Sequence, residues 1–242
     1  MEFPLNISSA ALAFGIALLG SILQGSIGFG LGLICVPLLV LIDPVFIPGP
    51  LLLSALLLNI LIYSRELRFI DKSGLKWAIP GRVLGAVLGA SLLTIIPQKN
   101  LSLLFGSMVI LAVSISFAGF DLPPTPWSVF GAGTFSGFMG TAASIGGAPM
   151  ALVYQRQKGP RIRGTLAAIF IFGTIISITS LAFIGRFGLK EIQAALLLFP
   201  GNIFGFLLSS RTARVLDRGF MRPAVLVASS ISGMIVVVKN IL

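Results

Sequence analysis

The sequence is poor in charged residues. Asp, Glu, Lys and Arg make up 10% of the 242 residues, and 56% are hydrophobic, whereas soluble domains carry about 25% charged residues. The uncharged stretches are 3–42, 44–64, 83–98, 100–120, 122–155, 164–185, 192–210 and 223–238. Most of them reach the roughly 20 residues that a helix needs to span a bilayer. The sequence therefore predicts an all-α integral membrane protein.

Residues that carry acid–base or metal chemistry are also scarce. There is no His. The carboxylates fall at predicted loops, segment ends or the terminus: Glu2, Asp43, Glu66, Asp71, Asp121, Glu191 and Asp217. Proton relays and metal or sodium sites usually need carboxylates or imidazoles at membrane depth, and nucleophilic catalysis needs a base. We therefore expect that the protein binds no metal and no cofactor, and that it is not an enzyme such as a lipid transferase. A site without carboxylates suits an anion instead.

The remaining composition excludes further classes. The single Cys35 excludes an internal disulfide. The net charge of +10 comes from short loops, where basic residues orient a membrane protein, so no nucleic-acid partner is expected. No basic segment precedes the first apolar run, so we expect no cleavable signal peptide.

The chain resembles itself at spacings of 112 to 120 residues. GSIGFGLGLICVP (25–37) matches GFMGTAASIGGAP (137–149), SGLK (73–76) matches FGLK (187–190), and IPGRVLG (79–85) matches FPGNIFG (199–205). Because the matches keep their order, we predict two membrane repeats. Repeat one covers 1–120 and repeat two covers 121–242, with a Pro-rich linker at 121–126.

Glycine clusters interrupt the leading segment of each repeat. A straight helix over 3–42 would be roughly 60 Å long, about twice the thickness of the hydrocarbon layer. The clusters are Gly25, Gly28, Gly30 and Gly32 in the first segment, and Gly137, Gly140, Gly146 and Gly147 in the second. Since Gly permits tight turns, we predict that each segment folds back as a hairpin. Re-entrant hairpins and pairs of short crossings both remain open.

The loop charges favour these hairpins. Three loops, near 65–76, 156–163 and 211–222, hold four Lys or Arg residues each. With Arg82 left out of the count, eight single crossings would leave seven and nine basic residues on the two sides, against the positive-inside rule. With hairpins the division is 12 against 4. Each half is then a broken Gly-rich hairpin plus three transmembrane helices, which gives two inverted-topology repeats with both termini outside.

The paired Gly-rich turns predict a binding site. Non-helical backbone at membrane depth survives only when it is buried or lines a cavity, and paired interruptions indicate a transporter's site. Helix N-termini there attract anions, so we expect N–H groups near Gly28, Gly30, Gly146 and Gly147 to cradle one. The other predicted site residues are Gln24, Gly25, Ser26, Ser136, Gly140, Thr141 and Ser144. Close helix packing by small residues is the alternative.

Four further residues carry predictions. Pro37 and Pro149 are expected to end or bend the returning half-helices. Arg82 either supplies positive potential at the cytoplasmic mouth of the pathway or snorkels to the interface. Asn59 either lines the pathway or bonds to a neighbouring helix, and the second interpretation is slightly favoured.

Two motifs carry a family resemblance. QGSIGFGLGLICVP (24–37) and its echo GTAASIGGAPM (140–150) are similar to the Gly-rich turns of the TauE/SafE family, the sulfite-exporter group of membrane permeases. The resemblance covers essentially the whole chain and implies transport of sulfite, of an organosulfonate such as sulfoacetate, or of another small anion. Only the two turns correspond residue by residue. The second turn is more polar and less regular, so the resemblance does not give the two equal roles.

We therefore predict a permease in a bacterial-type cytoplasmic membrane, surrounded by lipid. Its substrate is expected to be a small sulfur oxyanion, sulfite or an organosulfonate, moved outward. A membrane potential of 100 mV, negative inside, would favour outward movement by roughly 2.3 kcal/mol for each negative charge. Exchange remains open. The sequence leaves open whether the chain forms a homo-oligomer. The alternative function is a non-transporting membrane scaffold or assembly subunit.

Overall fold

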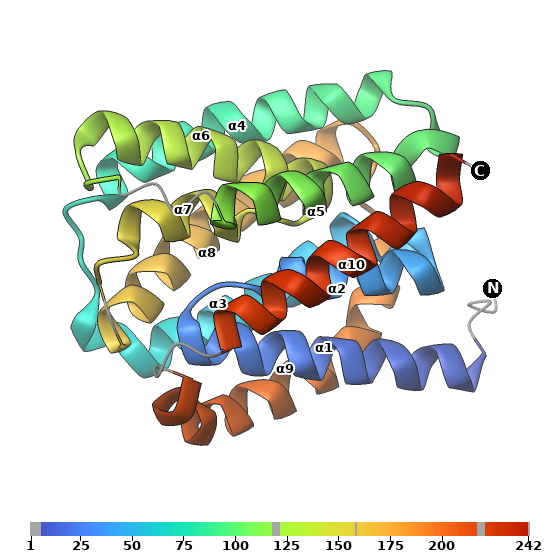
Figure 1. The fold of residues 1–242 in the computed structure, drawn as a ribbon. Helices are drawn as coiled ribbons and strands as arrows, with labels where there is room; N and C mark the ends of the chain where they lie inside the picture. The colour runs from blue at the N-terminus through green and yellow to red at the C-terminus, as the bar shows by residue number, and fades with distance from the viewer. Residues whose placement is uncertain (1–5, 118–121, 158, 217–220, 242) are drawn as a thin grey trace.

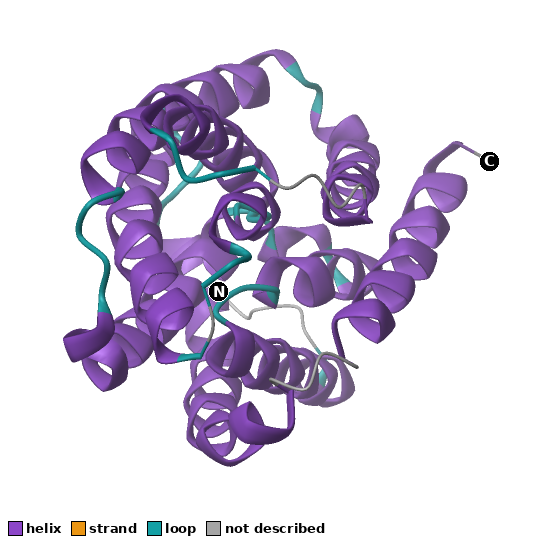
Figure 2. Cartoon of the chain, turned by 60° about the vertical axis from the view of Figure 1, so that its left-hand side comes forward, coloured by secondary structure: helices purple, strands orange, loops and turns teal. Residues whose placement is uncertain are grey.

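The computed structural model describes residues 6–117, 122–157, 159–216 and 221–241. These residues form helices connected by short loops, with no strand among them (Figure 2). The longer helices are α1 (Ile7–Ile27), α2 (Leu31–Ile42), α3 (Gly49–Glu66), α4 (Leu75–Ile95), α5 (Leu101–Phe117), α6 (Pro126–Ala143), α7 (Gly147–Tyr154), α8 (Pro160–Phe183), α9 (Leu189–Leu216) and α10 (Met221–Ile241). Short 3-10 turns lie at Pro44–Phe46, Leu67–Phe69 and Gln98–Asn100.

Several helices have the length and apolar composition of membrane spans. In the described part of the chain these are α1, α3 with its following turn, α4, α5 with its preceding turn, α8 and most of α9. Their outward faces carry exposed large side chains such as Leu88, Phe135 and Leu207, which suits contact with lipid. The prediction of an all-α integral membrane protein is confirmed.

Both leading segments are broken where their glycines and short polar residues gather. Gly28 and Gly30, with φ of 96° and 114°, separate α1 from α2, and Ser144, with φ of 61°, ends α6 before α7 begins. Each hairpin therefore has one long arm, of 21 or 18 residues, and one short arm, of 12 or 8 residues. Neither proline ends a returning helix, and the alternative that each bends its helix stays a prediction. Pro37 lies inside α2, and Pro149 lies in the first turn of α7, where a missing N–H is tolerated.

The first helix of each half packs on the fourth helix of the other half. α1 lies along α9 and α6 lies along α4 (Figure 1), and both contacts depend on glycines. A Cβ added to Gly85 would overlap the carbonyl oxygen of Thr134, and one on Gly205 would overlap that of Leu18. These two glycines occupy matching positions of the repeated motif. The boundary of the predicted repeats, at 120/121, lies outside the described residues, as do Glu2, Asp121 and Asp217.

The helix directions place the basic loops together. In Figure 1, α1 and α6 run in opposite directions, and the start of α1 and the end of α10 lie at the same end of the bundle. The last residues of α3, α7 and α9 lie at the opposite end. Hydrogen bonds connect the segments at this end of the bundle: Arg161 donates to Asp71, and Arg65 donates to Ser209.

Asp71 fastens two of these basic loops to each other. Its carboxylate accepts from the Ser73 hydroxyl at 2.6 Å, from Arg161 Nη2 at 2.8 Å and from Gln157 Nε2 at 3.2 Å. The hydrogen bonds from Ser73 and then Arg161 lower the pKa of Asp71 from its usual value to about 2.

Replacing Asp71 by Asn is therefore expected to destabilise the protein in a pH-dependent way. The folded-state pKa lies below the unfolded one, so the ionised group contributes about 2 kcal/mol above pH 4, and this contribution is lost as the pH falls from 4 to 2. Thermal unfolding in detergent should show wild type and Asp71→Asn differing at pH 7 and converging near pH 2. A difference that is independent of pH would contradict this assignment.

Candidate functional site

The bends of the two hairpins meet inside the bundle. A Cβ on Gly32 would overlap the carbonyl oxygen of Ser144, and one on Gly147 would lie 3.6 Å from the Gly30 nitrogen. The N-terminal ends of the short arms α2 and α7 therefore approach each other. The overlap at Gly32 is the reason that a residue without a side chain is needed at that point.

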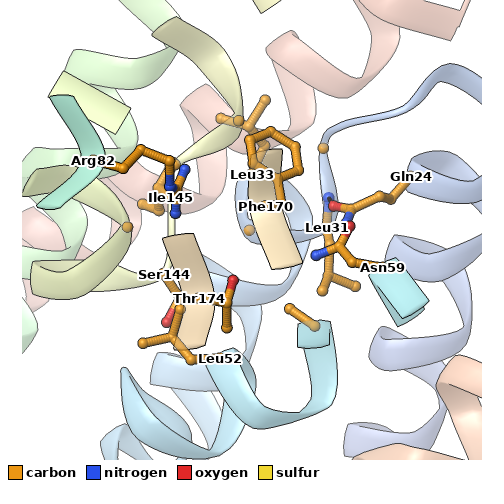
Figure 3. Close-up of a pocket in the computed structure, with 16 residues that line it drawn as sticks. Gln24, Leu31, Leu33, Leu52, Asn59, Arg82, Ser144, Ile145, Phe170 and Thr174 are labelled. Atoms are coloured by element: carbon orange, nitrogen blue, oxygen red, sulfur yellow. Dashed lines mark hydrogen bonds between the residues drawn. The ribbon is translucent and has the colours of Figure 1, made fainter. Parts of the chain in front are cut away.

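A small cavity lies between the bends (Figure 3). Its volume of about 40 Å³ corresponds to roughly three water molecules, because one water needs about 10–15 Å³ by this measure. Seven predicted site residues line it: Gln24, Gly30, Arg82, Gly140, Ser144, Gly146 and Gly147. The wall is completed mainly by α3 and α8, which contribute Asn59, Phe170 and Thr174 among others.

Of the described residues that line the cavity, Arg82 is the charged one. Its side chain is 2% exposed, Nη1 donates to the Ser136 hydroxyl, and the guanidinium carbon lies 5.4 Å from the centre of the Phe170 ring. Ser136 in turn donates to the carbonyl oxygen of Gly146. Arg82 is thus held against the α6–α7 bend and does not snorkel. It lies buried within the bundle, and the role of its charge at the cytoplasmic mouth of a pathway stays a prediction.

Gln24 and Asn59 form the opposite side of the cavity. Gln24 Oε1 accepts from the Leu31 N–H at 3.2 Å, which caps α2, and Gln24 Nε2 donates to Asn59 Oδ1 at 2.9 Å. These bonds orient Asn59 so that its amide nitrogen faces the cavity, across from Arg82 (Figure 3). Asn59 therefore bonds to a neighbouring helix, as one interpretation expected, and it also lines the cavity. That this cavity belongs to a transport pathway stays a prediction.

Helix ends add backbone donors to this wall. α2 begins at Leu31 and α7 begins at Gly147, and the first N–H groups of a helix have no partner within it. Gly32 and Leu33, in the first turn of α2, line the cavity, as do Gly146 and Gly147 at the start of α7. The N-terminal end of a helix favours negative charge, so both short arms act in the same sense as Arg82.

The other predicted site residues lie outside the cavity wall. Gly25, Ser26 and Gly28 lie where α1 ends, and there the Ser26 carbonyl accepts from Arg163 Nη1 at 3.1 Å. Thr141 donates to the Ser177 hydroxyl at 2.7 Å. Ser136 accepts a hydrogen bond from Arg82 but does not itself line the cavity. Sequence reasoning missed Phe170 and Thr174, because one aromatic and one hydroxyl residue in an apolar helix carry no distinguishing pattern.

The comparisons with known proteins agree with this architecture. The family model described as "Sulfite exporter TauE/SafE" matches residues 13–236, which is most of the chain. The chain belongs to the TauE/SafE family. Searches of curated proteins and of solved structures each return no significant match. This TauE/SafE protein is accordingly a multi-pass membrane permease, not an enzyme, and it transports sulfite or a related small anion in a lipid environment.

Proposed function

We propose that this TauE/SafE protein exports sulfite, or a sulfur oxyanion of similar size, through the cavity between its two hairpins. The observation that carries the proposal is the chemistry of the cavity wall. Arg82, the Asn59 amide nitrogen and two helix N-termini converge on it, and no carboxylate lines it. Such a set of donors matches an oxyanion, which presents only acceptors when fully ionised.

The size of the cavity favours the smaller substrates of the family. Its volume of about 40 Å³ suits an anion of about four heavy atoms, since it corresponds to roughly three waters. Sulfite has four heavy atoms, whereas sulfoacetate is twice as large and needs a wider cavity. We therefore expect sulfite to bind more tightly than sulfoacetate.

The proposed mechanism is alternating access by two inverted repeats, 1–120 and 121–242. Three observations support it: the opposite directions of α1 and α6, the exchanged packing of α1 on α9 and α6 on α4, and the matching glycines at 85 and 205. Inverted repeats commonly place the substrate between them and move one against the other. We further propose that the end with the basic loops faces the cytoplasm and both termini face outward, in a bacterial-type cytoplasmic membrane.

Thermal unfolding of the detergent-purified protein with a panel of anions tests the proposal. Sulfite, sulfate, thiosulfate, sulfoacetate, acetate and chloride are compared at equal ionic strength. A ligand at 100 times its Kd should stabilise the fold by about 2.7 kcal/mol. We expect the largest shift with sulfite and none with chloride, followed by protein-dependent sulfite efflux from vesicles. If no anion produces either a shift or a flux, the scaffold function replaces this proposal.

A further inference from the structure

The positive charge of the cavity has no counter-charge from the chain. In the described residues Arg82 forms no ion pair, and its Nε has no hydrogen-bond partner. The described carboxylates are engaged elsewhere. Glu66 pairs with Arg65 and Arg163, and Asp71 pairs with Arg161. Glu191 accepts from the Gly188 N–H and Asp43 accepts from the Val45 N–H. Among the residues that the structure describes, Ser136 and the Phe170 ring are therefore the groups that stabilise the Arg82 charge by a specific contact.

This charge cannot be removed by titration. An arginine stays protonated in proteins, and an isolated ionised group is strongly disfavoured away from water. Alternating access requires the cavity to close towards one side of the membrane before it opens towards the other. A bound anion neutralises Arg82 during this closed stage. Without an anion the closed stage contains a bare buried charge, so it forms more slowly.

We propose that the protein is an anion exchanger, in which the cavity changes sides rapidly only while an oxyanion is bound to Arg82. Each anion that leaves in one direction is then replaced by one that enters from the other side. The replacement has to be another small oxyanion that fits the same donors. This inference rests on the proposed function, because it assigns the exchange to the same cavity.

The first test compares two external solutions. Proteoliposomes are loaded with radiolabelled sulfite, kept free of oxygen, and diluted into unlabelled sulfite or into gluconate at equal ionic strength. We expect the label to leave at least ten times faster into sulfite. Equal protein-dependent rates overturn the exchange. Failure of every anion in the panel to show protein-dependent flux overturns the proposed function itself.

A second test uses the membrane potential and needs no variant. A potential of 100 mV is imposed with potassium and valinomycin while sulfite is present on both sides. Exchange of one sulfite for another moves no net charge, so the final distribution of label should not depend on the potential. Transport of a single unpaired charge would instead shift the distribution by about 50-fold per 100 mV. A shift of that size overturns the exchange.

Removing the charge provides the third test. Proteoliposomes that contain the Arg82→Gln protein, loaded at a raised sulfite concentration, should release label at the same rate into sulfite and into gluconate. No bare charge then remains to slow the return of the empty cavity to the inner side. Arg68 is exposed and lies outside the cavity wall, so Arg68→Gln, with the same change of charge, should keep the tenfold difference. Persistence of the difference in Arg82→Gln overturns the role given to Arg82.

Discussion

Arg82→Gln is expected to abolish the stabilisation by sulfite while leaving the anion-free protein at least as stable as wild type. The substitution removes the charge of Arg82 from the cavity wall, and the loss of a buried charge–charge contact should lower affinity about 100-fold or more. In the absence of anion the same change removes a buried charge without a counter-charge, which is neutral or stabilising. Thermal unfolding with and without sulfite measures both effects.

Loss of the stabilisation by sulfite, without loss of the anion-free stability, separates a binding role of Arg82 from a structural role. If Arg82 only held helices together, its replacement would lower the anion-free stability. Arg68→Gln is the matched control, because Arg68 is exposed in the turn after α3, and we expect it to bind sulfite as wild type does. A normal sulfite shift in folded Arg82→Gln protein would exclude Arg82 from the site.

Gly173 offers an independent way to disturb Arg82 without changing any charge. A Cβ at this position of α8 would overlap the Arg82 guanidinium, so Gly173→Ala has to move that group out of its place against the cavity. We expect weaker sulfite binding in this variant. Gly131→Ala in α6 is its control, since a Cβ there meets nothing within 4 Å and should leave binding unchanged.

Glu66→Gln is expected to lower the free energy of unfolding by about 3–5 kcal/mol, as breaking a buried ion pair typically does. Glu66 Oε1 accepts from Arg65 Nε and from Arg163 Nε, both at 3.0 Å, and the side chains of Glu66 and Arg163 are only 7% and 8% exposed. Without the carboxylate, two neighbouring guanidinium groups remain with no negative charge between them.

The loss of Glu66 should also release the first bend. Arg65 Nη2 donates to the Gly25 carbonyl and Arg163 Nη1 donates to the Ser26 carbonyl, so both arginines hold the last turn of α1. Thermal unfolding in detergent measures the loss of stability, with Glu191→Gln as the control because Glu191 is more exposed and accepts one backbone N–H. A change in the free energy of unfolding below about 1 kcal/mol, typical of a surface pair, would show that this ion-pair cluster does not hold the first bend in place.

The sequence predicted where the helices of the two hairpins are interrupted better than it predicted which side chains surround these points. Gly28 and Gly30 break the first segment through a positive φ that depends on the backbone alone, whereas the second break falls at Ser144, next to the predicted glycines. The cavity wall depends instead on which distant side chains meet. Gln24 reaches Asn59 and Arg82 reaches Ser136 only through helix packing, and no spacing in the sequence encodes these contacts.

The predicted residues that do not line the cavity lie elsewhere for a related reason. Gly25, Ser26 and Gly28 share the first bend with Gly30, but the last turn of α1 faces the arginines at the end with the basic loops. A Cβ on Gly28 would lie 3.1 Å from Arg163 Cα, so this glycine allows close contact with α8. Neighbours in a turn point in different directions, and sequence proximity alone does not separate them.

The exchanged packing of α1 on α9 has a consequence for how the chain is made. Ser21 donates to Asn202 at 2.8 Å across 181 residues, so α1 enters the bilayer long before the ribosome has produced its partner. During that interval its glycine and serine face is open to lipid or to other helices. The first half made alone lacks α9, and we expect it to be degraded in cells unless residues 121–242 are co-expressed as a separate chain.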